Sequence, residues 1–173
     1  MPLLRNGRIE ADEWIAVGDG DPVPADEPVI VPLPRWLDER QTLTYRKAPL
    51  GVRLRSDQPP SLIQDDIDRF ALVALEFPTF TDGRAYSYAR LLRERLGFKG
   101  ELRAVGNVLR DQLMFMARCG FDAFEADLRG GPEVWEASLA EIDVWYQPTG
   151  DGRASVVSLR HHSGRPAPAE AAQ

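Results

Sequence analysis

The feature that most constrains the fold is a regular alternation between short apolar segments and amphipathic segments. Five apolar segments of strand length are separated by turn-forming residues, at 28–33, 50–56, 70–77, 100–105 and 121–125. The third of them, FALVALEF, is apolar at almost every position, which predicts a central strand buried on both faces. Strands that alternate with helices predict an α/β fold, in which parallel strands are joined by right-handed helical crossovers.

The segments between the predicted strands carry the helical period. Apolar side chains recur at helical spacing in 84–96 and 108–119, and we expect further helices in SLIQDDIDRF and in PEVWEASLAEI. The helices at 84–96 and 108–119 both end in a Gly-Phe pair, at Gly97 and Gly120, where glycine favours a left-handed cap. The same order of helix, Gly-Phe, polar residue and strand therefore occurs twice, which indicates repeated βα units.

Five such units fit two architectures. One is part of a (β/α) barrel, with about five-eighths of the usual strand count. The other is an open doubly wound sheet. We favour the partial, barrel-like domain built from parallel βα units. An incomplete barrel leaves sheet edges uncovered, and a second copy of the chain would cover them, so we expect a homodimer.

The two ends of the chain differ from its middle. Asn6-Gly7 lies between short apolar stretches, which favours a tight hairpin, and residues 18–28 form a loop rich in Gly, Pro and Asp. We therefore expect a small N-terminal hairpin arm and linker over residues 1–27. A single α/β domain follows over 28–162, and a low-complexity tail, expected to be disordered, over 163–173.

Composition narrows the classes of function. The net charge of −6 argues against nucleic-acid binding. No apolar run approaches the ~20 residues of a membrane span, and the first residues lack the apolar core of a secretory signal, so we expect a cytoplasmic protein without membrane contact. One cysteine, Cys119, and the adjacent His161 and His162 do not make a metal or iron–sulfur site. No dinucleotide, Walker, zinc-protease or nucleophile-elbow motif is present, so we expect no cofactor.

Positive charge is concentrated in one part of the chain. Residues 82–118 carry a net charge of +4, whereas the remainder carries −10. Nearly all of the basic residues are arginine, whose planar guanidinium suits a bidentate grip on carboxylate, sulfate or phosphate. Ligands of both architectures bind beyond the carboxyl ends of the strands. The sequence therefore predicts an anion site at that end of the sheet.

The candidate residues follow three neighbouring predicted strands. The anion-binding candidates are Thr81, Gly83, Arg84, Ser87, Arg90, Asn107, Arg110 and Gln112. The tentative catalytic candidates are Glu76 and Asp111, each as a general base, and Glu125 is expected on the same rim. If Glu76 is partly buried, it needs a partner, for which Arg84 or Arg110 is the natural choice.

Plainer interpretations of the same residues stay open. Thr81 or Asp82 can serve as a helix N-cap, with Arg84 in solvent. Arg90 and Glu94 are four residues apart, as in an ordinary ion pair on a helix surface. Cys119 is interpreted as a small core residue.

Several stretches resemble one known family. FTDGRAYS (80–87), GELRAVGNVLRDQ (100–112), NGRIEADEW (6–14) and WYQP (145–148) are similar to a bacterial family of unknown function. Its members are often labelled as oxidoreductases of sulfite reduction, and the resemblance spans about residues 4–148. It implies genes that lie beside sulfite reductase genes in assimilatory sulfur metabolism. It implies no particular mechanism, and neither an iron–sulfur cluster nor a nicotinamide site finds support in these residues.

Three functional hypotheses follow. The first is an accessory protein of assimilatory sulfite or sulfate reduction that binds a small anion or docks on sulfite reductase through its basic rim. The second is a barrel-like enzyme that acts on a small sulfo- or phospho-anion with a carboxylate as general base. The third is a non-catalytic module for protein interaction, whose basic helix and acidic remainder meet a complementary partner.

Overall fold

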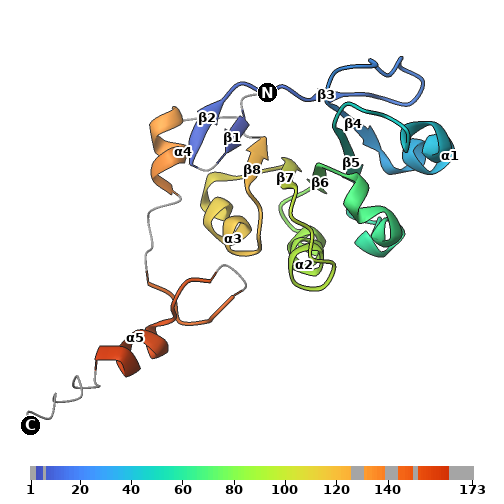
Figure 1. Ribbon diagram of the computed structural model, residues 1–173. Coiled ribbons are helices and arrows are strands. Elements are labelled where there is room, and N and C mark those ends of the chain that lie inside the picture. The colour runs from blue at the N-terminus through green and yellow to red at the C-terminus, as the bar shows by residue number, and fades with distance from the viewer. Residues whose placement is uncertain (1–2, 6, 126–130, 139–143, 150–151, 164–173) are drawn as a thin grey trace, which may run out of the picture.

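The strands form a single curled sheet in the computed structural model (Figure 1), which describes residues 3–5, 7–125, 131–138, 144–149 and 152–163. Within these residues the sheet has eight strands in the order β2-β1-β8-β7-β6-β5-β4-β3. Their bounds are β1 Leu3–Arg5, β2 Arg8–Glu10, β3 Ile15–Ala16, β4 Val29–Pro32, β5 Leu50–Leu54, β6 Leu72–Phe77, β7 Glu101–Gly106 and β8 Ala123–Glu125.

Helical segments connect the strands. They are α1 Leu33–Leu43, the 3-10 helices η1 Pro60–Leu62 and η2 Gln64–Arg69, α2 Arg84–Arg90 with the π-helical turn η3 Leu91–Arg95, η4 Arg110–Gln112 with α3 Leu113–Arg118, α4 Pro132–Ser138 and α5 Val156–Ser163. As expected, helices precede Gly97 and Gly120, and both glycines have a positive φ.

The strand order explains why the sheet curls. From β3 to β8 each strand pairs in parallel with the next one in the chain. Right-handed crossovers that all step in one direction place every connecting helix on the same face. Figure 1 shows α1, α2 and α3 on that outer face of the curved sheet. The partial-barrel prediction is confirmed, whereas the doubly wound alternative would require the strand order to reverse.

The N-terminal hairpin arm is also confirmed, and it extends the sheet at both ends. β1 and β2 pair antiparallel, and β1 pairs antiparallel with β8, with Leu4 opposite Phe124. β3 lies parallel to β4 at the other end. The chain therefore covers with its own strands the two edges that we expected a second copy to cover. The homodimer stays a prediction.

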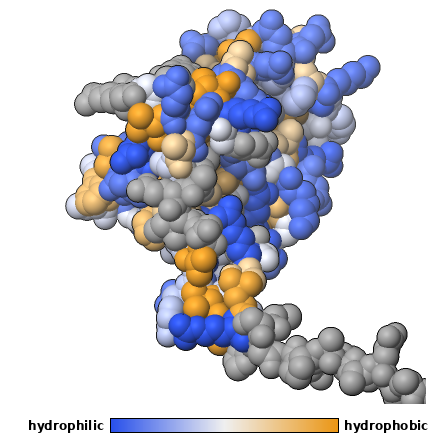
Figure 2. Space-filling model, turned by 90° about the vertical axis from the view of Figure 1, so that its left-hand side faces the viewer, coloured by the Kyte–Doolittle hydropathy of each residue, from blue (hydrophilic) through white to orange (hydrophobic). Residues whose placement is uncertain are grey.

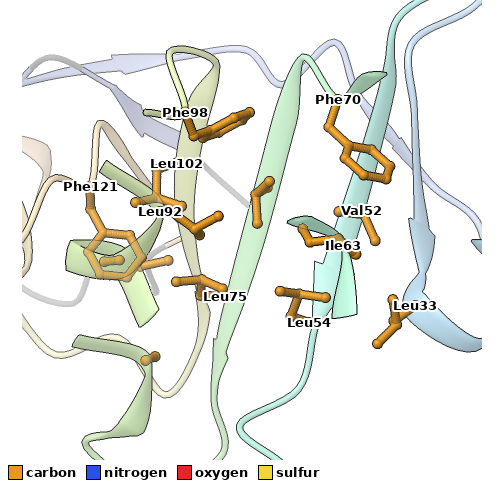
Figure 3. Packing of buried hydrophobic residues seen from close by; sticks show 14 of the residues in the cluster. Leu33, Val52, Leu54, Ile63, Phe70, Leu75, Leu92, Phe98, Leu102 and Phe121 are labelled. Carbon is orange, nitrogen blue, oxygen red and sulfur yellow. The ribbon is translucent and has the colours of Figure 1, made fainter. Parts of the chain in front are cut away.

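The main core lies between the sheet and the helices on its outer face. Val52, Leu54 and Leu75 point from the strands toward this layer (Figure 3), where they pack with Leu92 of η3 and Ile63 from the connection after β5. The outer face of each strand is thus apolar, as the strand periodicity predicts.

The inner face of the sheet carries a smaller apolar cluster and a buried charge. Trp14 packs against Ile30, Leu72 and Val105 on that face. In Figure 1 the chain between β2 and β3 runs across this side of the sheet, opposite the helices. Farther along the same face, Arg103 of β7 has no exposed surface.

Two predicted helices differ from the structure. SLIQDDIDRF forms the 3-10 helices η1 and η2 instead of one α-helix. The segment follows Pro59-Pro60 and is rich in Asp, a residue with low helix propensity. The second is the helix predicted over residues 108–119. There the 3-10 turn η4 covers Arg110–Gln112, and the α-helix α3 starts only at Leu113.

The C-terminal part of the described chain projects from the sheet. In Figure 1 the segment that ends in α5 lies below the body, and Figure 2 shows apolar surface on this part of the molecule. Val144, Tyr146, Val157 and Leu159 are all exposed there. Of the expected tail over residues 163–173, Ser163 is the last residue of α5, and the rest lies outside the described residues, as does the end of the helix predicted after Pro132. No helix among the described ones has the length and apolar content to cross a bilayer.

Candidate functional site

A hollow of about 370 Å³ opens on the inner face of the sheet, at the carboxyl ends of β3, β4, β5 and β6. Its walls are formed by Ala16, Val17, Gly18, Asp19, Ile30, Pro32, Pro34, Arg53, Arg55, Gln58 and Glu76. This is the end of a parallel sheet at which barrel-like folds bind their ligands. We call it the rim hollow.

Two arginines of the rim hollow come from β5 and the residue just after it. Leu50, Val52 and Leu54 are buried in the main core, so the alternation along a strand places Arg53 and Arg55 on the opposite, inner face. Their side chains are 43% and 61% exposed. Both guanidinium groups are therefore accessible from the hollow.

Within the described residues, each of these arginines has only loose contacts with carboxylates. Arg53 Nη2 lies 3.3 Å from Glu76 Oε2. Arg55 Nε lies 3.3 Å from Asp57 Oδ1, and its Nη2 donates to Asp57 Oδ2 over 3.4 Å. Because a guanidinium has five N–H donors, most donors of both groups remain available to a ligand.

Gln58 adds a further donor with a fixed orientation. Its side chain is 9% exposed, and its Oε1 accepts a 2.9 Å hydrogen bond from the backbone N–H of Arg55. The amide oxygen is thus engaged, which leaves the two N–H donors of Nε2. Across the described ranges of the chain, no acceptor contacts that nitrogen, and Gln58 lines the hollow. An amide that lines a hollow with its N–H groups unengaged is suited to a ligand that carries acceptor oxygens.

Glu76 supplies a carboxylate to the same hollow, but with a different partner from the predicted one. We expected Arg84 or Arg110, and the structure pairs it with Arg53 instead. The reason is the direction of the side chain. Glu76 lies on the inner face of the sheet, together with Leu72 and Ala74. The predicted partners instead belong to the helical segments of the outer face, because Arg84 begins α2 and Arg110 begins η4, which leads into α3.

The predicted residues at the start of α2 form a closed cluster of their own. Arg84 donates from Nε to Asp82 Oδ1 over 2.9 Å and from Nη2 to Asp82 Oδ2 over 2.7 Å, and it also reaches Ser56 Oγ at 3.0 Å. Asp82 Oδ1 accepts from the backbone N–H of Arg84 as well. The hydrogen bonds from Arg84 and Ser56 hold the pKa of Asp82 well below its usual range. The carboxylate of Asp82 therefore lies where we predicted an external anion.

The other candidates after β6 make local contacts. Thr81 Oγ1 lies 3.3 Å from Thr79 Oγ1, and Ser87 is exposed on α2. Arg90 pairs with Glu94 over 2.9 Å, as in the plainer interpretation. Gly83 precedes α2 with a φ of −92° and makes no side-chain cap.

The candidates after β7 also lie outside the rim hollow. Asn107, Arg110 and Asp111 are exposed. Gln112 has a buried Oε1 without a donor among the described residues. Glu125 lies 3.5 Å from the buried Arg103 and does not line the hollow.

Of all predicted site residues, the rim hollow contains only Glu76. Anion binding by the others stays a prediction. Arg53, Arg55 and Gln58 were missed, although LGVRLRS carries a signal for the two arginines. Its alternation places both on one face of a strand in the middle of the sheet, where an apolar residue is the usual choice.

A second hollow, of about 400 Å³, lies on the helix side. Cys119 lines it together with Arg93, Phe98, Arg118 and Asp122. Burial raises the pKa of the Cys119 thiol, although Arg90 and Arg118 act in the opposite direction. The residue is partly buried and packs against the main core.

Among the described residues, no group of His, Cys, Asp and Glu is arranged to hold a metal ion.

A comparison with protein-family models matches residues 51–157 to DUF934, described as a bacterial protein of unknown function. The match covers more than half of the chain. This protein belongs to the DUF934 family. Three of the four charged residues of the rim hollow, Arg53, Arg55 and Glu76, lie within the range that matches DUF934, as does Gln58, whereas Asp19 precedes it. No curated protein matches the chain.

Proposed function

We propose that this protein is a cytoplasmic accessory protein of assimilatory sulfite or sulfate reduction that binds a small sulfur oxyanion in the rim hollow. In this proposal Arg53 and Arg55 supply the charge, and Gln58 fixes the orientation of the ligand. Docking on sulfite reductase, through the ligand-bearing end of the sheet, stays part of the proposal.

The observation that carries the proposal is the set of donors around Gln58. Its amide oxygen is already engaged by the backbone of Arg55, so only N–H groups remain for a ligand. The two guanidinium groups beside it are accessible and loosely paired. Hydrogen bonds between charged donors and an oxyanion are shorter and about twice as strong as neutral ones.

The sulfur chemistry of the ligand is supported by the resemblance of this chain to proteins labelled for sulfite reduction. Sulfite and sulfate present several equivalent acceptor oxygens, which match donors that come from more than one direction. Phosphate has the same property, so it belongs in the test as a competing ligand.

The test is binding of inorganic sulfite, sulfate and phosphate to the full chain, measured by isothermal titration calorimetry and by thermal shift. A ligand that binds only the folded state must raise the melting temperature. We expect sulfite or sulfate to bind, and Arg55→Gln and Gln58→Glu each to weaken binding by about tenfold or more, since each removes or opposes a charge-assisted contact.

The matched control is Arg95→Gln. Arg95 is exposed on η3, outside the rim hollow, so this variant makes the same change of net charge as Arg55→Gln. Equal losses in both variants would show non-specific attraction and would contradict the proposal. Loss in Arg84→Gln or Arg110→Gln, with Arg55→Gln unchanged, would move the site to the originally predicted rim.

A further inference from the structure

We infer that the natural ligand of the rim hollow is zwitterionic, with an oxyanion and a cationic amino group joined by a short carbon chain. Amino sulfonates belong to this class. The inference rests on the proposed function, because it assigns the remaining chemistry of the same hollow.

The charges that line the hollow are balanced. Arg53 and Arg55 contribute two positive charges, and Glu76 and Asp19 contribute two negative charges. A bare oxyanion bound by the arginines would share the hollow with two carboxylates, whose negative charges repel it. A ligand with a group of each sign meets attraction at both ends.

The carboxylates have acceptor capacity to spare. Glu76 touches Arg53 through Oε2 only, and within the described part of the chain its Oε1 has no partner. Asp19, from the arm, likewise has no ion-pair or hydrogen-bond partner among the described residues, and it lines the hollow. An ammonium group is a compact donor of three hydrogen bonds, which suits a hollow lined by two carboxylates.

The remaining wall of the hollow is apolar. Val17, Ile30 and Pro32 line it between the charged residues. The volume of about 370 Å³ is at the lower end of the range for sites that bind organic molecules. A sulfite ion consists of one central atom and its oxygens, and it would leave this apolar wall in contact with water. A carbon chain between the two charged groups would cover the wall.

The experiment compares pairs of probes that differ only in the amino group. Calorimetry on the full chain would measure binding of 2-aminoethanesulfonate against ethanesulfonate, and of 3-aminopropanesulfonate against propanesulfonate. We expect at least one amino sulfonate to bind about tenfold or more tightly than the sulfonate that lacks the amino group. A tenfold difference in affinity is about what one charge-assisted hydrogen bond contributes. In Glu76→Gln, an isosteric change, that preference should fall to about twofold or less, whereas Arg55→Gln should weaken both members of the pair.

Each outcome decides between the two proposals. Equal binding of a sulfonate and its amino partner, with both lost in Arg55→Gln, would overturn the zwitterion and leave the oxyanion site intact. Failure of all four organic probes, with inorganic sulfite still bound, would also overturn the zwitterion alone. Failure of every probe, sulfite included, would overturn both. A preference that Glu76→Gln leaves unchanged would place the amino group elsewhere and would contradict this inference, and the melting temperature of the variant checks that it is folded.

Discussion

Arg53, Arg84, Arg93 and Arg103 carry the same guanidinium group but differ in what surrounds it. Arg84 is held by Asp82, and Arg93 donates to backbone carbonyls. Arg103 is wholly buried among carboxylates. Arg53 has one loose ion pair and an accessible side chain. The concentration of arginines in 82–118 led us to predict an anion site there, but most of those arginines are engaged within the protein. The accessible pair that lines the rim hollow lies outside that region.

Gly106 shows how a single residue fixes a strand end. Its φ is +90°, and a Cβ at this position would lie 2.6 Å from the carbonyl oxygen of Phe77. We expect Gly106→Ala to lower the free energy of unfolding by about 2 kcal/mol or more, because it adds a left-handed backbone penalty to a steric clash. Urea denaturation would measure the loss.

The matched control for that change is Gly83→Ala. Gly83 has a φ of −92°, and its added Cβ would lie 3.7 Å from Tyr86, an ordinary contact. We expect little change in stability. An equal loss in both variants would show that the backbone conformation at Gly106 is not what matters.

At the scale of elements, the ion pair between Asp82 and Arg84 at the start of α2 makes the stability of the protein depend on pH. The pKa of Asp82 is lowered, chiefly by its hydrogen bond with Arg84 and then by Ser56. A carboxyl group whose pKa is lower in the folded state than in the unfolded state makes its full contribution to stability above the ordinary aspartate pKa of about 3.9. That contribution is lost as the pH falls below this value toward the pKa of the folded state.

We therefore expect Asp82→Asn to be less stable than the parent at pH 7, and the difference to shrink on acidification below about pH 4. Denaturation with urea between pH 7 and pH 2.5 would measure it. Asp68→Asn is the control, because Asp68 is exposed and has no ion pair among the described residues. A difference for Asp82→Asn that stays constant with pH would contradict the assigned role of the ion pair.

Much of the order of elements could be predicted from the sequence. FALVALEF is the strand β6 near the middle of the sheet, and Gly97 adopts the predicted left-handed conformation. These features depend on local periodicity and backbone sterics, which a sequence displays directly. The connection SLIQDDIDRF was wrong as an α-helix. Three of its four apolar positions, Ile63, Ile67 and Phe70, are buried, whereas Leu62 is exposed.

The site was less predictable, because it depends on which face of a strand each side chain occupies. Glu76 was identified from its place at the end of a strand. Its partner Arg53 was not identified, because one must know how the whole sheet curls to tell which strand face is the inner one. Gln58 could not be found at all, since its proposed role rests on one backbone contact with Arg55.

At the scale of the whole molecule, one buried arginine joins the N-terminal arm to the sheet. Arg103 donates to Asp12 through Nη1 at 2.7 Å and Nη2 at 3.0 Å, and to Glu101 at 2.8 Å. Burial by itself would lower the pKa of Arg103, but the hydrogen bonds with Asp12 and the charge of Glu101 raise it overall. The guanidinium therefore stays charged beneath the arm.

We expect Arg103→Met to destabilise the fold by about 3–5 kcal/mol, because it leaves partly buried carboxylates without their partner. Arg90→Met is the control, since the ion pair of Arg90 with Glu94 lies exposed on a helix and should matter little. Chemical denaturation of the full chain would compare them. Similar small losses in both variants would show that the arm is held by apolar packing around Trp14.

The pairing of β1 with β8 also bears on how the protein is made. The parallel strands from β4 to β8 join their neighbours in chain order, so each can add to the last as the ribosome delivers it. Leu4 cannot pair with Phe124, the residue opposite it in β8, until Phe124 has been synthesised. Contacts between such distant parts of a chain form slowly. Until they form, the nascent chain presents the unpaired edge of β8 to its surroundings, and a chaperone or a neighbouring nascent chain can reach that edge before β1 pairs with it.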